Sequence, residues 1–183
     1  DPAKYLNAKP FVLPGQATAA AAPTVHVQAA SHVEDGHDGH GHAHHGHDHG
    51  APPVDPATGM TSLGDLPTGS SVSYAFGISN TPQVVGRGNT LDGDRAFVWS
   101  EATGMQNLGT MPNGYGSYAY GTNNNGEVVG HFTLGGQHRA FLWTAAAGML
   151  DLNLQADAEA SGWLLMEAYD INDNGWIVGL GVN

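Results

Sequence analysis

The sequence contains no cysteine, and only five of its 183 residues are lysine or arginine, against 17 aspartates and glutamates. The absence of cysteine excludes disulfides, thiol nucleophiles, iron–sulfur clusters and cysteine-based zinc sites. The formal net charge of −12 argues against nucleic acid or an anionic membrane surface as the main partner, because both are bound through clustered lysine and arginine. No apolar run approaches the ~20 residues of a membrane-spanning helix. We therefore expect neither a nucleic-acid partner nor a membrane span.

Recognisable catalytic motifs are absent as well. The sequence has no Gly-x-Ser-x-Gly elbow, no His-Glu-x-x-His pair and no glycine-rich phosphate loop before a helix. His131 and His138 are the two histidines of the C-terminal part, and a single histidine on a β-sheet is more often structural than catalytic. We predict that the protein is not an enzyme and has no catalytic residues.

Composition divides the chain into three zones. Residues 1–16 combine proline with large apolar side chains, which predicts an extended segment that can pair as a β-strand. Residues 17–56 are mainly alanine, proline, glycine and histidine, a composition typical of a linker that forms no packed core by itself. Residues 57–183 are rich in glycine, asparagine, valine and aromatic residues, with turn residues every eight to twelve positions, which indicates many short strands.

The third zone is built from repeated motifs. Corresponding motifs lie 44 or 45 residues apart, and up to 49 residues apart at the end of the third unit. They are Gly-Met-x-x-Leu from Gly59, Gly104 and Gly148; Ala-aromatic at Ala75, Ala119 and Ala168; Val-Gly at Gly86, Gly130 and Gly179; and Arg-Ala-Phe-x-Trp from Arg95 and Arg139. Asn- and Gly-containing turns favour hairpins between the second and third motifs. We predict an all-β fold of three tandem four-stranded antiparallel units, 57–101, 102–145 and 146–183, similar to β-propeller blades or to layers of a stacked-sheet array.

The period, the Val-Val-Gly motif and the Ala-Phe-Leu-Trp motif together resemble the HAF-repeat family of bacterial extracellular proteins. The resemblance covers residues 57–183, although Arg95 and Arg139 stand where the family has the histidine of its His-Ala-Phe motif. It implies secretion and a repeat architecture, and it implies no reaction. We therefore expect an extracellular location, either secreted, at the cell surface or in a matrix.

The third unit lacks the Ala-Phe-Leu-Trp strand. Its last motif, with Ile177 and Val178, is followed only by residues 179–183, which would leave an unpaired strand edge. The N-terminal segment carries a similar motif: Phe11 aligns with Phe97 and Phe141, Val12 with Val98 and Leu142, and Leu13 with the tryptophans. We expect Phe11, Val12 and Leu13 to supply the missing strand beside Ile177 and Val178.

This donor strand has two ways to complete the sheet. It can fold back into its own molecule, or it can enter the gap of a neighbouring copy, and head-to-tail insertion of this kind propagates into filaments. A linker of about forty residues spans roughly 35 Å as a random coil, so both are within reach. The functional hypothesis is a structural subunit of an extracellular filament or matrix whose main partner is a further copy of itself.

The linker also contains a histidine tract with glycine between the imidazoles. The candidate metal ligands are His37, His40, His42, His44, His45, His47 and His49. Imidazole suits copper, zinc and nickel, whereas a solvated spacer is the alternative interpretation of the tract. Residues 170–175 match the start of a calcium loop but coincide with a hairpin turn and lack the acid at the twelfth position, so calcium is not expected.

Two further functions remain open from the sequence. The protein can be a monomeric exported metal-sequestering protein in which the repeats are only a carrier. It can also be a β-repeat module that binds glycans or proteins through exposed tyrosines.

Overall fold

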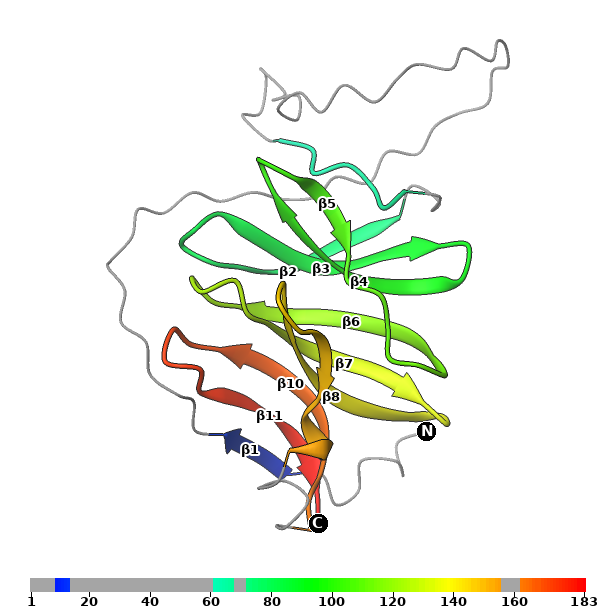
Figure 1. Ribbon diagram of the computed structural model, residues 1–183, viewed down its shortest axis with the longest axis vertical. Helices are drawn as coiled ribbons and strands as arrows, with labels where there is room; N and C mark the ends of the chain where they lie inside the picture. Colours follow the sequence, from blue (N-terminus) through cyan, green and yellow to red (C-terminus); the bar gives the residue numbers. More distant parts are fainter. Residues whose placement is uncertain (1–8, 14–60, 68–71, 156–161) are drawn as a thin grey trace.

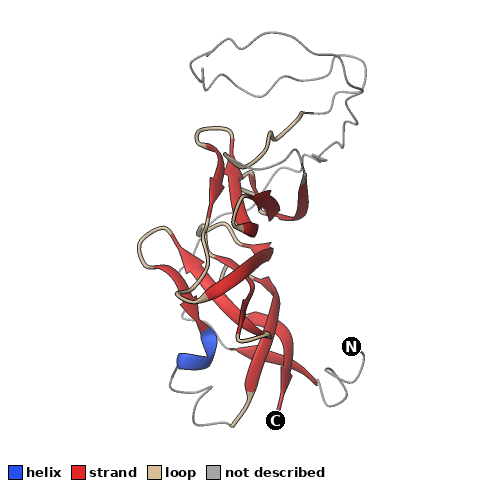
Figure 2. Cartoon of the chain, turned by 90° about the vertical axis from the view of Figure 1, so that its right-hand side faces the viewer, coloured by secondary structure: helices blue, strands red, loops and turns tan. Residues whose placement is uncertain are grey.

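The computed structural model describes residues 9–13, 61–67, 72–155 and 162–183, and for residues 9–13 it describes the backbone only. These residues form an all-β protein of three antiparallel sheets stacked one above another, which confirms the all-β class predicted from the sequence (Figure 1). Figure 2 shows the same stack turned by 90°. The helical segment of the described ranges is the 3-10 turn η2 (Leu152–Leu154), and within these ranges no helix has the length and apolar character needed to cross a membrane.

The strands follow the order of the sequence within each sheet. The first sheet contains β2 (Ser73–Ile78), β3 (Gln83–Thr90), β4 (Gly93–Ser100) and β5 (Gly104–Asn107). The second contains β6 (Gly114–Thr122), β7 (Val128–Leu134), β8 (Gln137–Thr144) and β9 (Gly148–Asp151). The third contains β10 (Leu164–Ile171), β11 (Ile177–Val182) and, from the other end of the chain, β1 (Lys9–Leu13).

Each sheet is displaced by one strand from the repeat units of the sequence. The Gly-Met strands β5 and β9 pair with the strand before them rather than opening the sheet that follows. The cause is local: three-residue turns, 101–103 and 145–147, connect each Gly-Met strand to its predecessor. Gly104 and Gly148 end these turns with φ angles of +64° and +72°, a conformation that favours glycine.

Apolar side chains fill the space between the sheets. Val85 and Val98 of the first sheet pack with Val128 and Phe141 of the second in one buried cluster. Residues of the second and third sheets, with Leu152, form the next cluster. Burying each such side chain contributes about 1.5–3 kcal/mol, so these interfaces hold the stack together.

Strand β4 is buried on both faces, as the sequence predicts. Ala96 and Val98 lie in the cluster between the first and second sheets. Phe97 and Trp99 lie in a separate cluster on the opposite face of the first sheet. The alternation of side chains along a strand places successive residues in different layers.

Candidate assembly edge and candidate metal centre

Strand β1 takes in the third sheet the place that β4 has in the first sheet and β8 in the second. It runs antiparallel to β11, with Phe11 opposite Gly179. The first sheet has the same pairing between β4 and β3, where Phe97 lies opposite Gly86, and the second sheet repeats it between β8 and β7. The five sequence-predicted assembly residues therefore lie on two paired strands, here of the same chain: Phe11 is opposite Gly179, Val12 is opposite Val178 and Leu13 is opposite Ile177.

The segment that should follow such a strand lies at the other end of the stack. Residues 57–67 read ATGMTSLGDLP and repeat residues 102–112, which read ATGMQNLGTMP and begin two residues after the end of β4. The described part, residues 61–67, packs on the first sheet, where Leu63 and Leu66 join the cluster of Phe97. In Figure 1 this cyan segment lies at the top of the stack and β1 at the bottom. The structure thus separates two segments whose counterparts are joined by a three-residue turn in the first and second sheets.

A second cluster joins the second and third sheets. His131 on β7, His138 on β8 and Glu167 on β10 have ligand atoms that all lie within 4.8 Å of one another. His131 is buried, and His138 Nδ1 lies 2.7 Å from Glu167 Oε1. The two imidazole rings are stacked, with centroids 4.0 Å apart and planes 20° from parallel.

The stacked rings do not converge on a single ion. The lone pair of an imidazole nitrogen lies in the ring plane, so an ion bound by both histidines must lie close to both planes. Rings that are stacked and nearly parallel, as His131 and His138 are, have no such common point close to both nitrogens. The cluster has a suitable set of donors for a transition metal, but one imidazole has to rotate before an ion is held.

The equivalent positions between the first and second sheets carry a different polar link. Arg87 and Asp94 form an ion pair there, and the hydroxyl of Tyr118 donates to Asp94 Oδ2 at 2.7 Å. The Arg87 guanidinium lies between the rings of Tyr74 and Tyr118, 4.5 and 5.1 Å from their centroids. Burial, followed by the hydrogen bond to Asp94, raises the pKa of Tyr118. These three positions therefore connect neighbouring sheets at both junctions, with different residues at each.

Sequence reasoning missed the histidine cluster. It treated His131 and His138 as isolated, because Glu167 is 29 residues away from His138 and only the stacking of the sheets brings them together. The available signal was the repeat itself. His131 and His138 stand 44 residues after Arg87 and Asp94, two oppositely charged residues whose pairing would have indicated that the two histidines are also neighbours. The predicted metal ligands of the tract, His37 to His49, lie outside the described residues.

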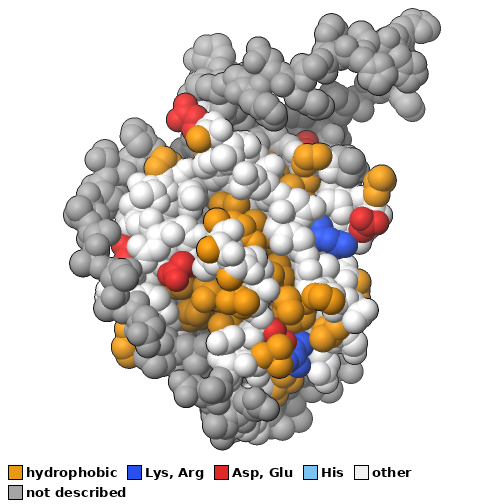
Figure 3. Space-filling model, viewed as in Figure 1, with side chains coloured by type: hydrophobic (Ala, Val, Ile, Leu, Met, Phe, Trp, Pro, Cys, Tyr) orange, Lys and Arg blue, Asp and Glu red, His pale blue; other side chains and the backbone are white. Residues whose placement is uncertain are grey.

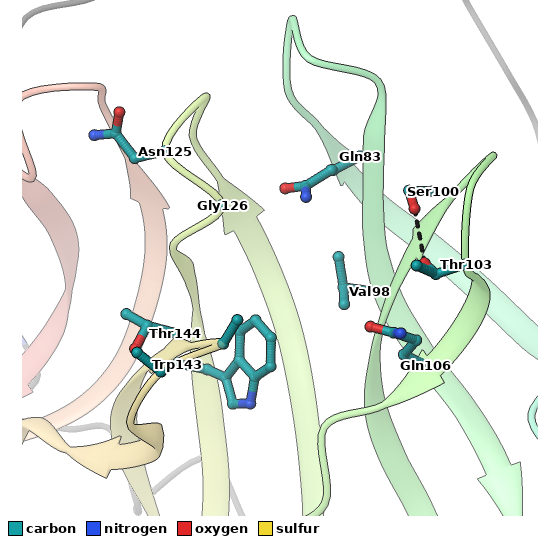
Figure 4. Close-up of a pocket in the computed structure, with 11 residues that line it drawn as sticks. Gln83, Val98, Ser100, Thr103, Gln106, Asn125, Gly126, Trp143 and Thr144 are labelled. Atoms are coloured by element: carbon teal, nitrogen blue, oxygen red, sulfur yellow. Dashed lines mark hydrogen bonds between the residues drawn. The ribbon is translucent and has the colours of Figure 1, made fainter.

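A groove also opens between the first and second sheets. It has a volume of about 410 Å³ and lies between Val98 and Trp143, with the amides of Gln83 and Gln106 at its walls (Figure 4). None of the side chains that line it is charged. On the face seen in Figure 3, apolar side chains gather near the middle and basic ones are sparse.

The described residues define an all-β protein of stacked antiparallel sheets. No protein-family model matches the chain, and searches of curated proteins and of solved structures found no match. The resemblance to the HAF-repeat family therefore stays a prediction.

Proposed function

We propose that the protein is a structural subunit that polymerises head to tail, with β1 of each copy inserted into the third sheet of its neighbour. The proposed product is an extracellular filament or matrix. One observation carries the proposal: β1 has the pairing of β4 and β8, yet residues 61–67, which match the segment that follows β4, lie at the opposite end of the stack from β1. Insertion into a neighbour places both segments at one junction.

The junction formed in this way resembles those inside the chain. In the first sheet, β4 is followed by β5, and Leu108 then enters the cluster between the first and second sheets. In the polymer, β1 of one copy lies in the third sheet of its neighbour, and residues 61–67 of the same copy follow beside it. The contact is heterologous, because one end of the molecule binds the other end of the next, and such contacts propagate as open filaments.

The histidine tract then recurs once per subunit along the filament. Residues 17–56 separate β1 from residues 61–67, so in the polymer they form an insertion at each junction. Copper, zinc and nickel are the proposed ions, because imidazole nitrogen suits all three. Metal bound by tracts of adjacent subunits would strengthen the filament.

Cysteine crosslinking tests strand exchange directly, because the chain has no cysteine of its own. Val12 and Val178 lie opposite each other across the β1–β11 pair. A Val12→Cys chain and a Val178→Cys chain, unfolded, mixed and refolded together, are expected to give disulfide-linked dimers on oxidation, and the wild-type chain is expected to form filaments visible by electron microscopy. A mixture of Val12→Cys with Leu91→Cys is the control, since Leu91 lies on the exposed β3–β4 turn. Crosslinks confined to a Val12→Cys/Val178→Cys double variant, within one chain, would show self-closure and overturn the proposal.

A second candidate is a monomeric exported metal-sequestering protein. The observation that favours it is the grouping of His131, His138 and Glu167, which becomes a second set of donors beside the tract once one imidazole rotates. This candidate requires metal binding without polymerisation, and it predicts that removal of β1 leaves metal affinity unchanged.

A further inference from the structure

We infer that the two ends of the stack are complementary docking surfaces, so that the first sheet of one copy stacks face to face on the third sheet of the next. The inference rests on the proposed head-to-tail polymer and goes beyond it, because it adds a sheet-to-sheet interface to strand insertion. We call the faces of the first and third sheets that are turned away from the second sheet the outer faces.

The outer face of the third sheet exposes a valine that is buried in the other two sheets. Val85 and Val129 are fully buried, each covered by the sheet that follows. Their counterpart Val178 is 42% exposed. Its neighbour Ile177 packs toward the second sheet, so alternation along β11 directs Val178 to the outer face. This position is buried wherever a following sheet is present.

The outer face of the first sheet likewise exposes an aliphatic residue whose counterparts are buried. Thr122 and Ile171 are 7% and 4% exposed beneath the preceding sheet, whereas their counterpart Ile78 is 47% exposed. Ile78 lies opposite Val84, which belongs to the cluster on the outer face. The two exposed aliphatic residues thus stand at the positions that meet inside the chain, since Val129 and Ile171 share one cluster.

Two leucines already occupy the place of an internal junction. Leu108 and Met111 lie in the cluster between the first and second sheets. Their counterparts in the 45-residue repeat, Leu63 and Leu66, are 5% and 3% exposed on the outer face of the first sheet. This outer face therefore already carries the residues that fill such a junction. The outer face of the third sheet of a neighbouring copy would complete the junction.

The hairpin turns add polar contacts that can continue. The turn of the second sheet binds the turn of the third, with Asn125 Nδ2 donating to the carbonyl oxygen of Asp173 at 2.9 Å. At the ends of the stack, Asn174 and Asn80 stand at the same two positions, and both are exposed. A stacked neighbour brings these two residues together.

One position makes the new junction differ from the internal ones. A Cβ at Gly77 would lie 2.5 Å from the carbonyl oxygen of Tyr120, so glycine allows the close approach of β2 and β6. Asp170 stands at the corresponding position of β10. Because Asp170 has a side chain, β2 of the next copy must lie further from β10 than β6 lies from β2. The junction between copies is therefore less tightly packed than those within a copy.

The test uses Ile78→Asp in the full chain, because Ile78 belongs to β2, and the sheet of β2 lies at the other end of the stack from the β1–β11 pair (Figure 1). We expect at least a tenfold rise in the critical concentration for polymerisation, measured by sedimentation and electron microscopy, because a carboxylate in a buried interface is strongly unfavourable. Val178→Asp should give the same loss from the other face. Leu91→Asp, at a residue that is 86% exposed on the β3–β4 turn, is the matched control and should polymerise as wild type. Thermal unfolding monitored by circular dichroism verifies that each variant is folded. If Ile78→Asp does not fold, Ile78→Ser takes its place.

Each outcome separates the two proposals. Normal polymerisation of Ile78→Asp, with filaments lost on deletion of residues 1–16, would overturn face-to-face stacking and leave strand insertion intact. A wild-type chain that stays monomeric at every concentration would overturn both. Loss in Ile78→Asp but not in Leu91→Asp supports stacking, whereas loss in Val178→Asp agrees with both proposals, because Val178 also lies opposite Val12.

Discussion

At the scale of single residues, two glycines set the distance between neighbouring sheets. Gly77 and Gly121 lie where the backbone of the next sheet comes closest. The sequence pattern indicates glycine as a turn residue. These two glycines lie within strands instead, and they are required because any Cβ there would collide with the backbone of the next sheet. Their role becomes visible only once the sheets are stacked.

Replacing Gly121 by alanine is expected to destabilise the fold. The new Cβ would lie 2.8 Å from Asp170 Cα, so the second and third sheets would have to move apart. Overpacking of this kind costs about 1–3 kcal/mol of unfolding free energy, measurable by urea denaturation. Gly116→Ala is the control on the same strand, because its nearest neighbours lie 4.0 Å away. Equal losses in the two variants would contradict this account.

The link at Tyr118 predicts a dependence on alkaline pH. Burial and the hydrogen bond to Asp94 raise the pKa of Tyr118 above its ordinary value of 10.0. The unfolded chain therefore loses this proton first, and the contribution of Tyr118 to stability, complete below pH ~10, falls as the pH rises through the folded pKa. Unfolding free energies across this range should decline more steeply for wild type than for Tyr118→Phe. Parallel curves would show that Tyr118 titrates normally.

At the scale of secondary-structure elements, β7, β8 and β10 hold the histidine cluster while the tract lies elsewhere in the chain. Because the rings of His131 and His138 are stacked, we expect the tract to provide most of the zinc affinity. Deleting residues 37–49 should remove most zinc binding in a competition assay with a chromophoric chelator, whereas His138→Ala should change it less than twofold. A larger loss in His138→Ala would show that one ring rotates and that the cluster is the metal centre.

The strands also show where sequence patterns were sufficient. The Ala-Phe-x-Trp motif predicted a strand buried on both faces, and β4 is such a strand, because its alternate residues enter two different clusters. The Gly-Met motif predicted a strand correctly but not its partner. The predicted unit boundaries, 101/102 and 145/146, fall within the short turns 101–103 and 145–147, and these turns join each Gly-Met strand to the strand before it instead of separating the two.

At the scale of the whole molecule, a polymer built from one donor and one acceptor end has a simple capping behaviour. A chain that lacks residues 1–16 retains the free edge of β11 but has no β1 to donate. Small amounts of this variant, mixed with the full chain, are expected to stop growth at one end and shorten the filaments seen by electron microscopy. Adding the same amount of full-length Leu91→Asp should leave the length distribution unchanged. An unchanged distribution with the truncated chain would contradict donor-strand growth.

The sequence by itself determined the all-β class, the strand positions and the likeness of residues 9–13 to a fourth strand, because alternation, turn residues and repeated motifs are local properties of the chain. The tertiary structure decided which strands share a sheet, which residues meet between sheets and which faces stay uncovered. His138 and Glu167 come together, and Val178 stays exposed, because of how the sheets stack. Contacts between residues distant in the sequence depend on that stacking, which no short motif encodes.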